Sequence, residues 1–513
     1  MGSERVIVVG AGIGGMTAAI DLARQGFDVT VLERALTPGG KMREVPIGHL
    51  CVDSGPTVLT MRDVFDDLFA ACGADFASVV PLTPLTILAR HAWTETQRFD
   101  LHADLERTVD AVGDFAGSAD ARRYRAFARD AGDIYRTLKD TFLNASRPNP
   151  VSLAQRIGLH RPGALLAIRP FDTLWRALGS YFHDPRLRQL FARYATYSGS
   201  SPFLAPATLM LIAHVEQEGV WAVDGGMQRL ADALARLAAQ QGCTLRYASD
   251  VKTVETRHGR VRGVALASGE RIEADAVVLN ADAAGIAAGL LGADISNTAD
   301  AIELKSRSLS AITWSMVAPA RGFPLHRHNV FFGPDYAEEF DALFRHRRLP
   351  KQPTIYVCAQ DRLDGQRDLT ADSERLLVLV NAPATADTHP ISAEEIATCE
   401  TQTFNFLAHC GLNIRRTAQT TVVSTPTDFN RMFPGTGGAL YGRATHGWAA
   451  SFQRPHAQTR ISGLYLAGGS VHPGAGVPMA ALSGRLAARQ LIADRPSTPA
   501  YRKAGISGGM SMR

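Results

Sequence analysis

The chain has 513 residues, of which 46% are hydrophobic and 20% are charged, and these are ordinary values for a globular protein. Its net charge of +4 is small and spread along the chain, with no basic stripe that includes aromatic residues, so we expect no nucleic-acid partner. The length predicts more than one domain.

The sequence has no secretory signal and no uninterrupted apolar stretch of the ~18 residues that a transmembrane helix needs. We therefore expect a cytoplasmic protein or one that lies on a membrane surface. The six cysteines are scattered without a C-x-x-C pair, which predicts buried free thiols and neither disulfides nor a zinc site. We expect no metal ion.

The N-terminal segment has the pattern of a dinucleotide-binding unit. Residues 6–9 form a short β-branched run, which predicts a buried parallel strand. Gly10, Gly12 and Gly15 follow at the spacing G-x-G-x-x-G, which allows a tight turn, close approach of a pyrophosphate and close packing of a helix on the strand. A helix is predicted over about 14–25, with its positive N-terminus facing the pyrophosphate.

The next residues indicate which dinucleotide binds. Residues 28–32 predict a second strand, and Glu33 at its end is placed to bind a ribose hydroxyl. The glycine pair Gly39-Gly40 follows this unit. The arrangement resembles the extended fingerprint of the GG-doublet flavoproteins, which include amine oxidases, protoporphyrinogen oxidases and carotenoid desaturases, and the resemblance implies FAD. Because the chain has no second G-x-G-x-x-G, we expect no NAD(P)H site.

Two stretches of the first half differ in character. Residues 107–143 indicate a largely helical and polar stretch, whereas residues 150–182 mix Leu, Ile, Phe and Trp with Arg161, Arg169 and Arg176. Such a mixture fits a membrane interface, where aromatic rings lie at headgroup depth and arginines reach the polar surface. A core-facing pair of helices is the alternative.

The middle of the chain predicts a small antiparallel set of strands at residues 243–254, 259–264 and 272–279. GG-doublet enzymes lay a strand at this place against the adenosine half of FAD, which implies contacts near Val251 and Asn280. A purely structural sheet is the alternative.

Further β-rich runs at residues 311–317, 354–359 and 375–381 predict a separate sheet, which we expect to form the floor of a substrate domain. Residues 463–488 then have the order strand, glycine-rich loop and helix, with the helix beginning at about Val477. The loop can approach a planar ring, and the helix N-terminus can face the pyrophosphate or the flavin carbonyls. Two distant segments are thus predicted to close around one cofactor.

Together with other motifs, these segments resemble the bacterial phytoene-desaturase family over essentially the whole chain. The closer resemblance is to the branch of that family that acts on hydroxylated carotenoids. The motifs that carry the resemblance lie at residues 182–191, 197–202, 214–226, 433–442, 446–455 and 467–473.

The resemblance implies an α/β fold, with a GG-doublet FAD-binding Rossmann-like domain and an interleaved α+β substrate domain, as in the amine oxidases. It divides the chain into FAD-binding parts at 1–100, 221–300 and 441–495, a helical substrate or membrane-facing region at 101–220, a substrate-domain sheet at 301–440 and a disordered tail at 496–513.

The activity that the resemblance implies is FAD-dependent formation of the C3–C4 double bond in acyclic 1-hydroxycarotenoids, such as the conversion of 1-hydroxyneurosporene to demethylspheroidene, by hydride transfer to flavin. The enzyme would lie at the cytoplasmic periphery of the bacterial inner (photosynthetic) membrane, with oxygen or a quinone as electron acceptor. Phytoene desaturase or another polyene oxidase of the family is the alternative. A non-catalytic isoprenoid-lipid carrier is a more distant alternative, since such carriers lack an intact set of cofactor loops.

The expected FAD contacts lie in the glycine loops and at the adjoining strand ends: Gly10, Gly12, Gly14, Gly15, Glu33, Arg34, Gly39, Gly40, Lys41, Met42, Gly55, Val251, Asn280, Gly468, Gly469, Val477, Pro478 and Met479. The flavin is the expected catalyst. His472 in the flavin-side loop is expected to orient the ring or relay a proton, and His446 and Tyr441 are expected to hydrogen-bond the substrate hydroxyl. A structural loop histidine and a packed turn are the respective alternatives.

Overall fold

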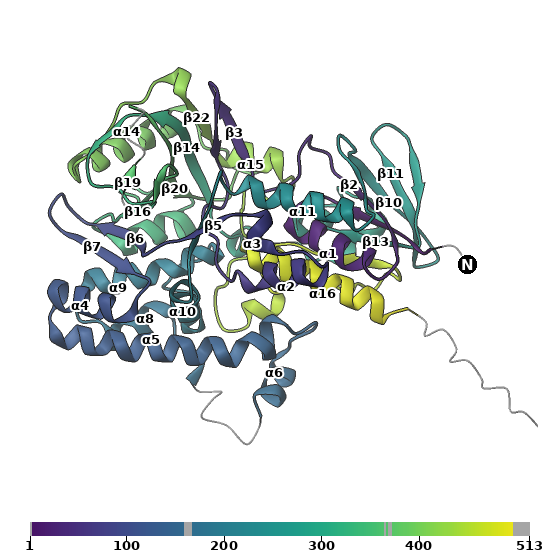
Figure 1. The fold of residues 1–513 in the computed structure, drawn as a ribbon, viewed down its shortest axis with the longest axis horizontal. Coiled ribbons are helices and arrows are strands. Elements are labelled where there is room, and N and C mark those ends of the chain that lie inside the picture. Colours follow the sequence, from purple (N-terminus) through teal and green to yellow (C-terminus); the bar gives the residue numbers. More distant parts are fainter. Residues whose placement is uncertain (1–2, 159–166, 364–365, 368–371, 496–513) are drawn as a thin grey trace, which may run out of the picture.

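The computed structural model describes residues 3–158, 167–363, 366–367 and 372–495. Arg161 and the tail that is predicted to be disordered lie outside these residues. Figure 1 shows two regions, with a parallel sheet and its helices near the N-terminus and a larger sheet with a layer of helices below it at the other end of the molecule.

The first region is built on a five-stranded parallel sheet in the order β23-β13-β1-β2-β9. Its strands are β1 (Arg5–Val9), β2 (Asp28–Leu32), β9 (Thr244–Arg246), β13 (Ala276–Leu279) and β23 (Leu464–Leu466). The strands predicted at 6–9 and 28–32 are therefore confirmed. The sheet collects strands from the beginning, the middle and the end of the chain, and this places three distant loops at one sheet edge.

Alternating side chains of β1 explain how this sheet is covered. Val6 and Val8 pack into the core that also contains α1 (Ile13–Ala23) and α16 (Val477–Ala493), and Ile7 and Val9 pack into the core beneath the second, three-stranded sheet. Helix α11 (Gln228–Gln240) also packs on the α1 side. The antiparallel sheet on the other side comprises β10 (Val251–Arg257), β11 (Arg260–Leu266) and β12 (Arg271–Glu273).

Two predicted strands are wrong in their extent. The segment 243–254 splits into β9 and β10, and the segment 272–279 splits into β12 and β13. In both cases the chain passes from one sheet to the other, and the apolar residues of each segment pack in two different hydrophobic cores. A run of apolar residues does not reveal such a change of partner.

The second region contains a seven-stranded sheet in the order β22-β14-β20-β17-β16-β6-β7, antiparallel except between β16 and β6. The predicted separate sheet is thereby confirmed, but it also includes β6 and β7, which lie at 87–102, at the end of the segment predicted to be the first FAD-binding part. The strands are β6 (Ile87–Ala92), β7 (Arg98–His102), β14 (Ser310–Ala318), β16 (His328–Phe331), β17 (Ile355–Ala359), β20 (Glu374–Ala382) and β22 (Thr421–Ser424).

The two faces of this sheet have different partners. On one face, Trp314 of β14 packs edge-on against Phe404 of α14 (Ala393–His409), within a separate hydrophobic core. The opposite face presents Thr313, Tyr356 and Leu379 toward a cavity. The period of two along each strand therefore separates a packed face from a face that is available to a ligand.

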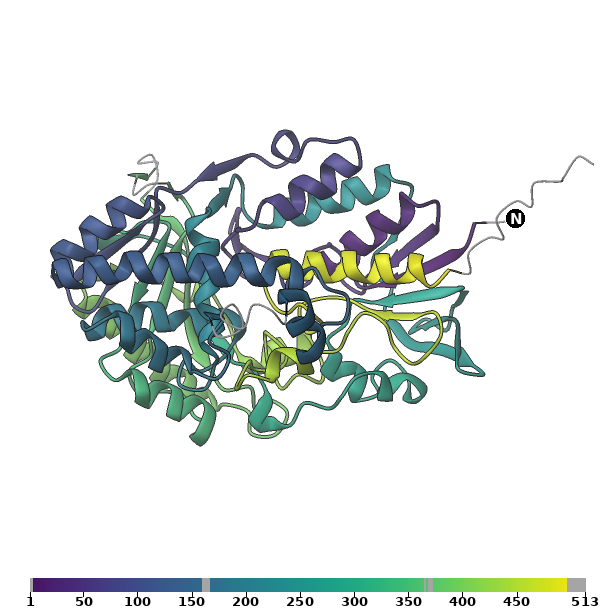
Figure 2. The ribbon, with the colours of Figure 1, turned by 90° about the horizontal axis from the view of Figure 1, so that it is seen from below.

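Helices lie below the seven-stranded sheet, and Figure 2 shows the long α5 crossing the underside of the molecule. The stretch predicted to be helical at 107–143 is confirmed, with a break at Gly117, whose φ of 90° ends the first helix. The helices of this layer are α4 (Leu105–Ala116), α5 (Ser118–Leu138), α8 (Leu174–Tyr181), α9 (Pro185–Ala192) and α10 (Leu211–Gln217).

Shorter elements connect these layers. Among the described residues, the other helices are α2 (Asp63–Ala71), α3 (Phe76–Val79), α6 (Pro150–Ile157), α12 (Ala283–Ala287), α13 (Tyr336–Asp341) and α15 (Pro426–Met432). The two-stranded pairs are β3 (Glu44–Ile47) with β4 (Leu50–Asp53), β5 (Leu82–Pro84) with β8 (Trp221–Val223), β15 (Ala320–Gly322) with β21 (Leu412–Ile414), and β18 (Arg362–Leu363) with β19 (Gln366–Arg367). Short 3₁₀ or π turns span Lys139–Leu143, Arg193–Ser198, Ala207–Met210, Ala293–Thr298, Leu304–Ser306, Ala342–His346, Ala418–Thr420 and Ala450–Gln453.

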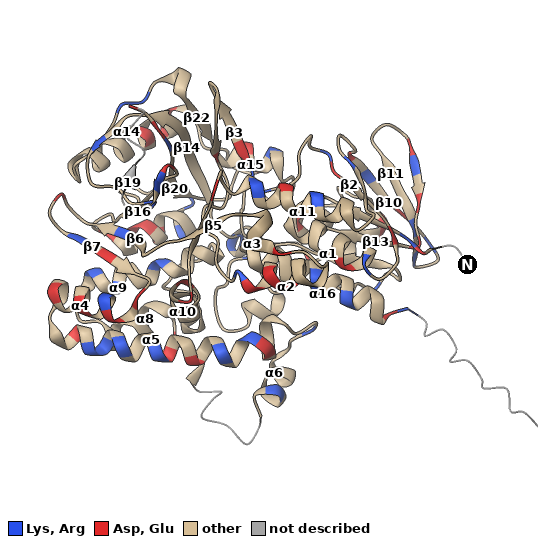
Figure 3. Cartoon of the chain, viewed as in Figure 1, with Lys and Arg blue, Asp and Glu red and all other residues tan. Residues whose placement is uncertain are grey.

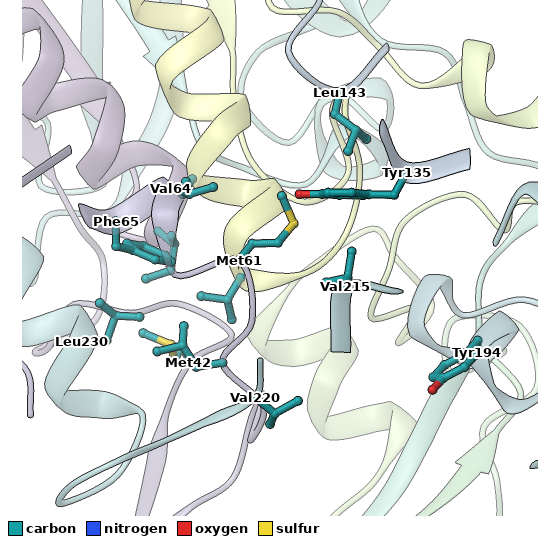
Figure 4. Packing of buried hydrophobic residues seen from close by; sticks show 14 of the residues in the cluster. Met42, Met61, Val64, Phe65, Tyr135, Leu143, Tyr194, Val215, Val220 and Leu230 are labelled. Atoms are coloured by element: carbon teal, nitrogen blue, oxygen red, sulfur yellow. The ribbon is translucent and has the colours of Figure 1, made fainter. Parts of the chain in front are cut away.

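The largest hydrophobic core joins the two regions. Figure 4 shows part of it, with Met42 from the N-terminal loops, Phe65 from α2 and Tyr135 from α5. Because these side chains come from elements far apart in the sequence, the nucleotide-binding region and the helical layer share one core. The predicted burial of the cysteines is wrong for Cys51, which is exposed, and for Cys72, which is only partly buried.

Charged residues are mixed over the fold. Figure 3 shows both acidic and basic residues along α5, in agreement with the small net charge of the chain. Within the described part of the chain, no helix combines the length and the hydropathy that a membrane span requires.

Candidate active site

A cavity of about 1080 Å³ runs between the two regions. Its walls at one end are the loops after β1, β2 and β13 and the N-terminus of α16, and at the other end they include the free face of the seven-stranded sheet and helices of the lower layer. The cavity therefore joins a nucleotide-binding edge to a largely apolar arm.

The nucleotide end is formed where three glycine-rich or polar loops meet around Asn280. The Asn280 side chain donates to Gly10 O at 3.4 Å, and a Cβ atom on Gly12 would lie 2.6 Å from its Nδ2 atom. A Cβ atom on Gly14 would lie 2.9 Å from the backbone nitrogen of Gly468. Glycine is therefore needed at these positions for the three loops to meet, and the backbone at the N-terminus of α1 remains accessible to a phosphate.

Glu33 lies at the end of β2 and is buried. Its carboxylate accepts hydrogen bonds from the backbone nitrogens of Ala11 at 2.6 Å and Ala35 at 2.8 Å. The side chain thus ties the glycine turn to the end of the second strand. Each carboxylate oxygen keeps a further lone pair, so the acceptor capacity for a ribose hydroxyl remains.

A buried guanidinium forms part of the cavity wall. Arg454 is 4% exposed and donates to the carbonyl oxygens of Tyr441 and Gly469, both at 3.1 Å, and of Arg443 at 2.9 Å. Burial lowers the pKa of Arg454 to about 10, although the charge of Asp282 opposes the shift. This side chain fastens the turn at 441–443 to the loop before α16.

Comparison with known proteins identifies the family. The model of the family described as flavin containing amine oxidoreductase matches residues 13–492. The chain belongs to this family. It is 51% identical to a hydroxyneurosporene desaturase of Rubrivivax gelatinosus over 513 residues, covering 100% of this chain and 97% of the relative.

Further relatives agree with this assignment. A hydroxyneurosporene desaturase of Cereibacter sphaeroides is 44% identical over 493 residues, which cover 96% of this chain and 98% of the relative. Among solved structures, a putrescine oxidase variant superposes with a TM-score of 0.61 at 13% identity, covering 96% of this chain and 99% of that structure. The predicted amine-oxidase-like fold is confirmed.

As a member of the flavin-containing amine oxidoreductases, the protein is an oxidoreductase with FAD as its cofactor, and the cavity walls fit that group. The side chain of Asn280 leaves no room for a Cβ atom on Gly12 or on Gly468, so the cavity wall there is bare backbone, which can supply the N–H donors that a pyrophosphate needs. The N-termini of α1 and α16 both line the same cavity. Their dipoles favour negative charge on the phosphates and on the ring.

The structure places most of the predicted residues at the cavity. Those that line it are Gly10, Gly12, Gly14, Glu33, Arg34, Gly39, Gly40, Lys41, Met42, Gly55, Val251, Asn280, Tyr441, Gly468, Gly469, Val477, Pro478 and Met479. Gly15 does not line the cavity. A Cβ atom there would lie 2.0 Å from Gly10 O, so Gly15 allows α1 to pack on the turn, and its contribution to the site is indirect.

The two predicted histidines are not among the lining residues. His446 Nε2 accepts a hydrogen bond from the Ser201 backbone nitrogen at 3.0 Å, and burial lowers the pKa of His446 to about 4. His472 Nε2 bonds to Phe142 O at 3.1 Å, and burial lowers the pKa of His472 to about 3. Both imidazoles are therefore neutral at pH 7 and hold segments of the wall together from behind the cavity.

Sequence analysis missed a set of polar residues in the apolar arm. Arg193, Tyr197, Glu216 and Tyr356 all line the cavity. A signal was present, because Arg193 stands between aromatic and apolar residues at the end of a buried helix, and Glu216 stands in a similar segment. Ionisable groups at such positions need a partner or a function.

Proposed function

We propose that this protein is an FAD-dependent desaturase that forms the C3–C4 double bond of acyclic 1-hydroxycarotenoids, for example in the conversion of 1-hydroxyneurosporene to demethylspheroidene. The observation that carries the proposal is the continuity of the cavity from the dinucleotide loops to a long apolar arm. The names of the relatives that are 44% and 51% identical agree with this substrate class.

The reaction removes two hydrogens from neighbouring carbons. When bound, FAD accepts two electrons with one hydrogen as a hydride. C4 is next to the polyene, so a positive charge that develops there is delocalised, and C4 is the better hydride donor. C3 then loses a proton to a base or to water, and the C3–C4 double bond forms.

The protein's contribution is to position the polyene and to keep the reacting carbons dry. Apolar side chains of the lower layer line the arm, among them Leu138, Phe142, Leu143, Leu153, Leu209, Ile212 and Val215. They contact a hydrocarbon chain without polar competition. The turn at 441–443, which Arg454 fastens to the flavin-side loop, brings Tyr441 to the wall at the junction of the arm with the ring end.

The mouth of the arm supports delivery of the substrate from a membrane. Phe171 is 75% exposed and Trp448 is 46% exposed, yet both line the cavity and their rings meet edge-on with centroids 5.8 Å apart. Val151 of α6 is 66% exposed. Exposed aromatic and apolar side chains around an entrance fit the interface of a lipid bilayer, in which a carotenoid dissolves. We accordingly place the protein at the cytoplasmic periphery of the bacterial inner membrane, with oxygen or a quinone as electron acceptor.

The test is a product analysis with two substrates. FAD-loaded protein is mixed with liposomes that carry either 1-hydroxyneurosporene or phytoene, and the carotenoid spectrum is followed. We expect a red shift by one double bond for the hydroxylated substrate and no change for phytoene. Stepwise conversion of phytoene to coloured products would replace the proposal with a phytoene desaturase. If the protein retained no FAD and bound both compounds without converting them, the result would favour a non-catalytic isoprenoid-lipid carrier.

A further inference from the structure

The apolar arm contains a polar cluster that the chemistry described so far does not use. It consists of Arg193, Tyr197, Glu216 and Tyr356, all of which line the cavity. Polar groups that lose water without gaining a partner are costly, so such a cluster inside a hydrocarbon-binding arm requires an explanation.

The members of the cluster hold one another in fixed positions. Glu216 accepts hydrogen bonds from the hydroxyl groups of Tyr197 and, at 2.8 Å, of Tyr194, which lies outside this cavity. The Tyr356 hydroxyl lies 2.6 Å from Thr57 Oγ1 and 2.7 Å from His328 Nδ1. The hydroxyl groups of both tyrosines are therefore already hydrogen-bonded, and their rings form rigid walls.

Arg193 lies between these walls. Its guanidinium carbon is 5.6 Å from the centre of the Tyr197 ring and 5.4 Å from the centre of the Tyr356 ring. No ion pair among the described residues includes Arg193; its electrostatic partners include Glu216, through a longer-range attraction, and the side chain of Tyr197. An arginine has five N–H donors and no acceptor, so donors remain for a ligand oxygen.

The cluster lies beside the ring end of the cavity. A Cβ atom on Gly199, two residues after Tyr197, would be 2.5 Å from Tyr441, and a Cβ atom on Gly442 would be 3.0 Å from Ser470 Cβ in the flavin-side loop. Thr57, which is hydrogen-bonded to Tyr356, belongs to the same loop as Gly55, and a Cβ atom on Gly55 would lie 2.1 Å from Lys41 O. Tyr441 therefore lies between the Arg193 cluster and the flavin-side loop, which contains Ser470.

We propose that Arg193 donates a hydrogen bond to the tertiary hydroxyl oxygen of the substrate and so selects the hydroxylated end group. This inference rests on the proposed function. Only three carbon–carbon bonds separate the hydroxyl-bearing C1 from C4, so a hydroxyl held beside the ring end brings C3 and C4 to the flavin. A hydrocarbon end group would leave the arginine donors without a partner, and a site built in this way rejects the analogue that lacks the hydroxyl.

In this proposal Arg193 takes the place of His446 as the partner of the hydroxyl. His446 is not a lining residue, and its Nε2 atom is occupied by Ser201. Tyr441 does line the cavity and contacts the loop of the cluster at Gly199, so it closes the pocket next to Arg193. Arg193 is a specificity-determining residue in this account, and Tyr197 and Tyr356 are the positioning residues that hold its guanidinium.

The test compares substrate pairs that differ only in the hydroxyl. Dissociation constants for 1-hydroxyneurosporene and neurosporene are measured by tryptophan-fluorescence quenching, for the FAD-loaded wild type and for Arg193→Met, Arg193→Lys and Tyr194→Phe. We expect the wild type to prefer the hydroxylated compound by about tenfold or more, as for a hydrogen bond to a charged group. Arg193→Met should remove this preference without weakening neurosporene binding, and Arg193→Lys should restore part of it.

Tyr194→Phe is the matched control, because Tyr194 donates to the same carboxylate as Tyr197 but from outside the cavity. It should keep the preference. An unchanged preference in a folded Arg193→Met protein would overturn the inference. Turnover of 1-hydroxyneurosporene by the wild type tests the proposed function separately, because the binding ratio is measured whether or not the bound carotenoid is converted.

Discussion

Gly14 and Gly484 bring the two ends of the chain into direct backbone contact. A Cβ atom on Gly484 of α16 would lie 2.0 Å from Gly14 O and 2.2 Å from Thr17 Oγ1 of α1. The first and the last long helices can therefore lie against each other, as Figure 2 shows, with both N-termini at the cofactor end of the cavity. We expect the binding of FAD to depend on this contact, because it sets the distance between the two glycine loops.

Gly484→Ala tests the contact. A methyl group at this position must push the helices apart, so we expect a loss of stability of about 3 kcal/mol, at the upper end of the usual cost of overpacking, together with weaker FAD retention. Thermal unfolding and the flavin content of purified protein are the measurements. Gly113→Ala is the control, since a Cβ atom there meets Ala121 at an ordinary 3.7 Å within a helix. Equal behaviour of the two variants would contradict the packing argument.

Glu33→Gln tests the nucleotide end. The glutamate accepts two backbone N–H groups, whereas a glutamine would turn an NH₂ group toward one of them. We expect FAD to bind about tenfold or more weakly, because a charge-assisted hydrogen bond is lost and a donor is left facing a donor. Titration of apoprotein with FAD by flavin fluorescence measures the change. The exposed Glu44, substituted in the same way, should leave the affinity at the wild-type value.

The buried His446 predicts a loss of stability on acidification. The folded pKa is lowered from 6.5 to about 4 by burial, so in the folded protein the imidazole stays neutral while in the unfolded chain it takes up a proton. Stability contributed by the neutral form is present above about pH 6.5 and is lost as the pH falls toward 4. The full loss is on the order of 3 kcal/mol for this residue.

Urea unfolding at several pH values measures this loss. His446→Gln keeps an acceptor for the Ser201 backbone nitrogen but does not titrate, so its stability should fall less steeply between pH 6.5 and 4. The exposed His49, replaced by glutamine, provides the comparison and should follow the wild type. Parallel curves for all three proteins would rule out His446 as a contributor.

The entrance of the apolar arm predicts membrane binding through two aromatic residues. Replacing Phe171 and Trp448 together by serine should weaken co-sedimentation with liposomes roughly tenfold, because the exposed rings no longer enter the interface. Activity on detergent-solubilised carotenoid should change much less than activity on liposome-bound carotenoid. Leu36→Ser removes a side chain that is 80% exposed and does not line the cavity, and it should not alter either value.

The parts of the fold that sequence alone could predict are those with a local signal. β2 spans residues 28–32, as the apolar residues before Glu33 predict, and α16 begins at Val477 after the glycine-rich loop, as predicted. These features depend on neighbours within a few residues. The glycine spacing also carries its own physical reason, because only backbone fits between the loops around Asn280.

The parts that could not be predicted depend on contacts between distant segments. The split between β12 and β13 follows from which sheet each half joins, and the apolar run contains no mark of that change. The cluster around Arg193 is assembled from the end of α9, from α10 and from β17, so no spacing in the sequence reveals it. The position of His472 in the flavin-side loop predicted a role at the flavin, but its ring contacts Phe142.

The most direct test of the central claim is a single anaerobic turnover. FAD-loaded protein is mixed with one equivalent of 1-hydroxyneurosporene without an electron acceptor, and the flavin and carotenoid bands are followed together. The account predicts that oxidised flavin is lost at the same rate as the carotenoid spectrum shifts by one double bond, that deuterium at C4 slows both, and that phytoene leaves the flavin oxidised. Flavin that stays oxidised with 1-hydroxyneurosporene, or that is reduced by phytoene instead, would contradict it.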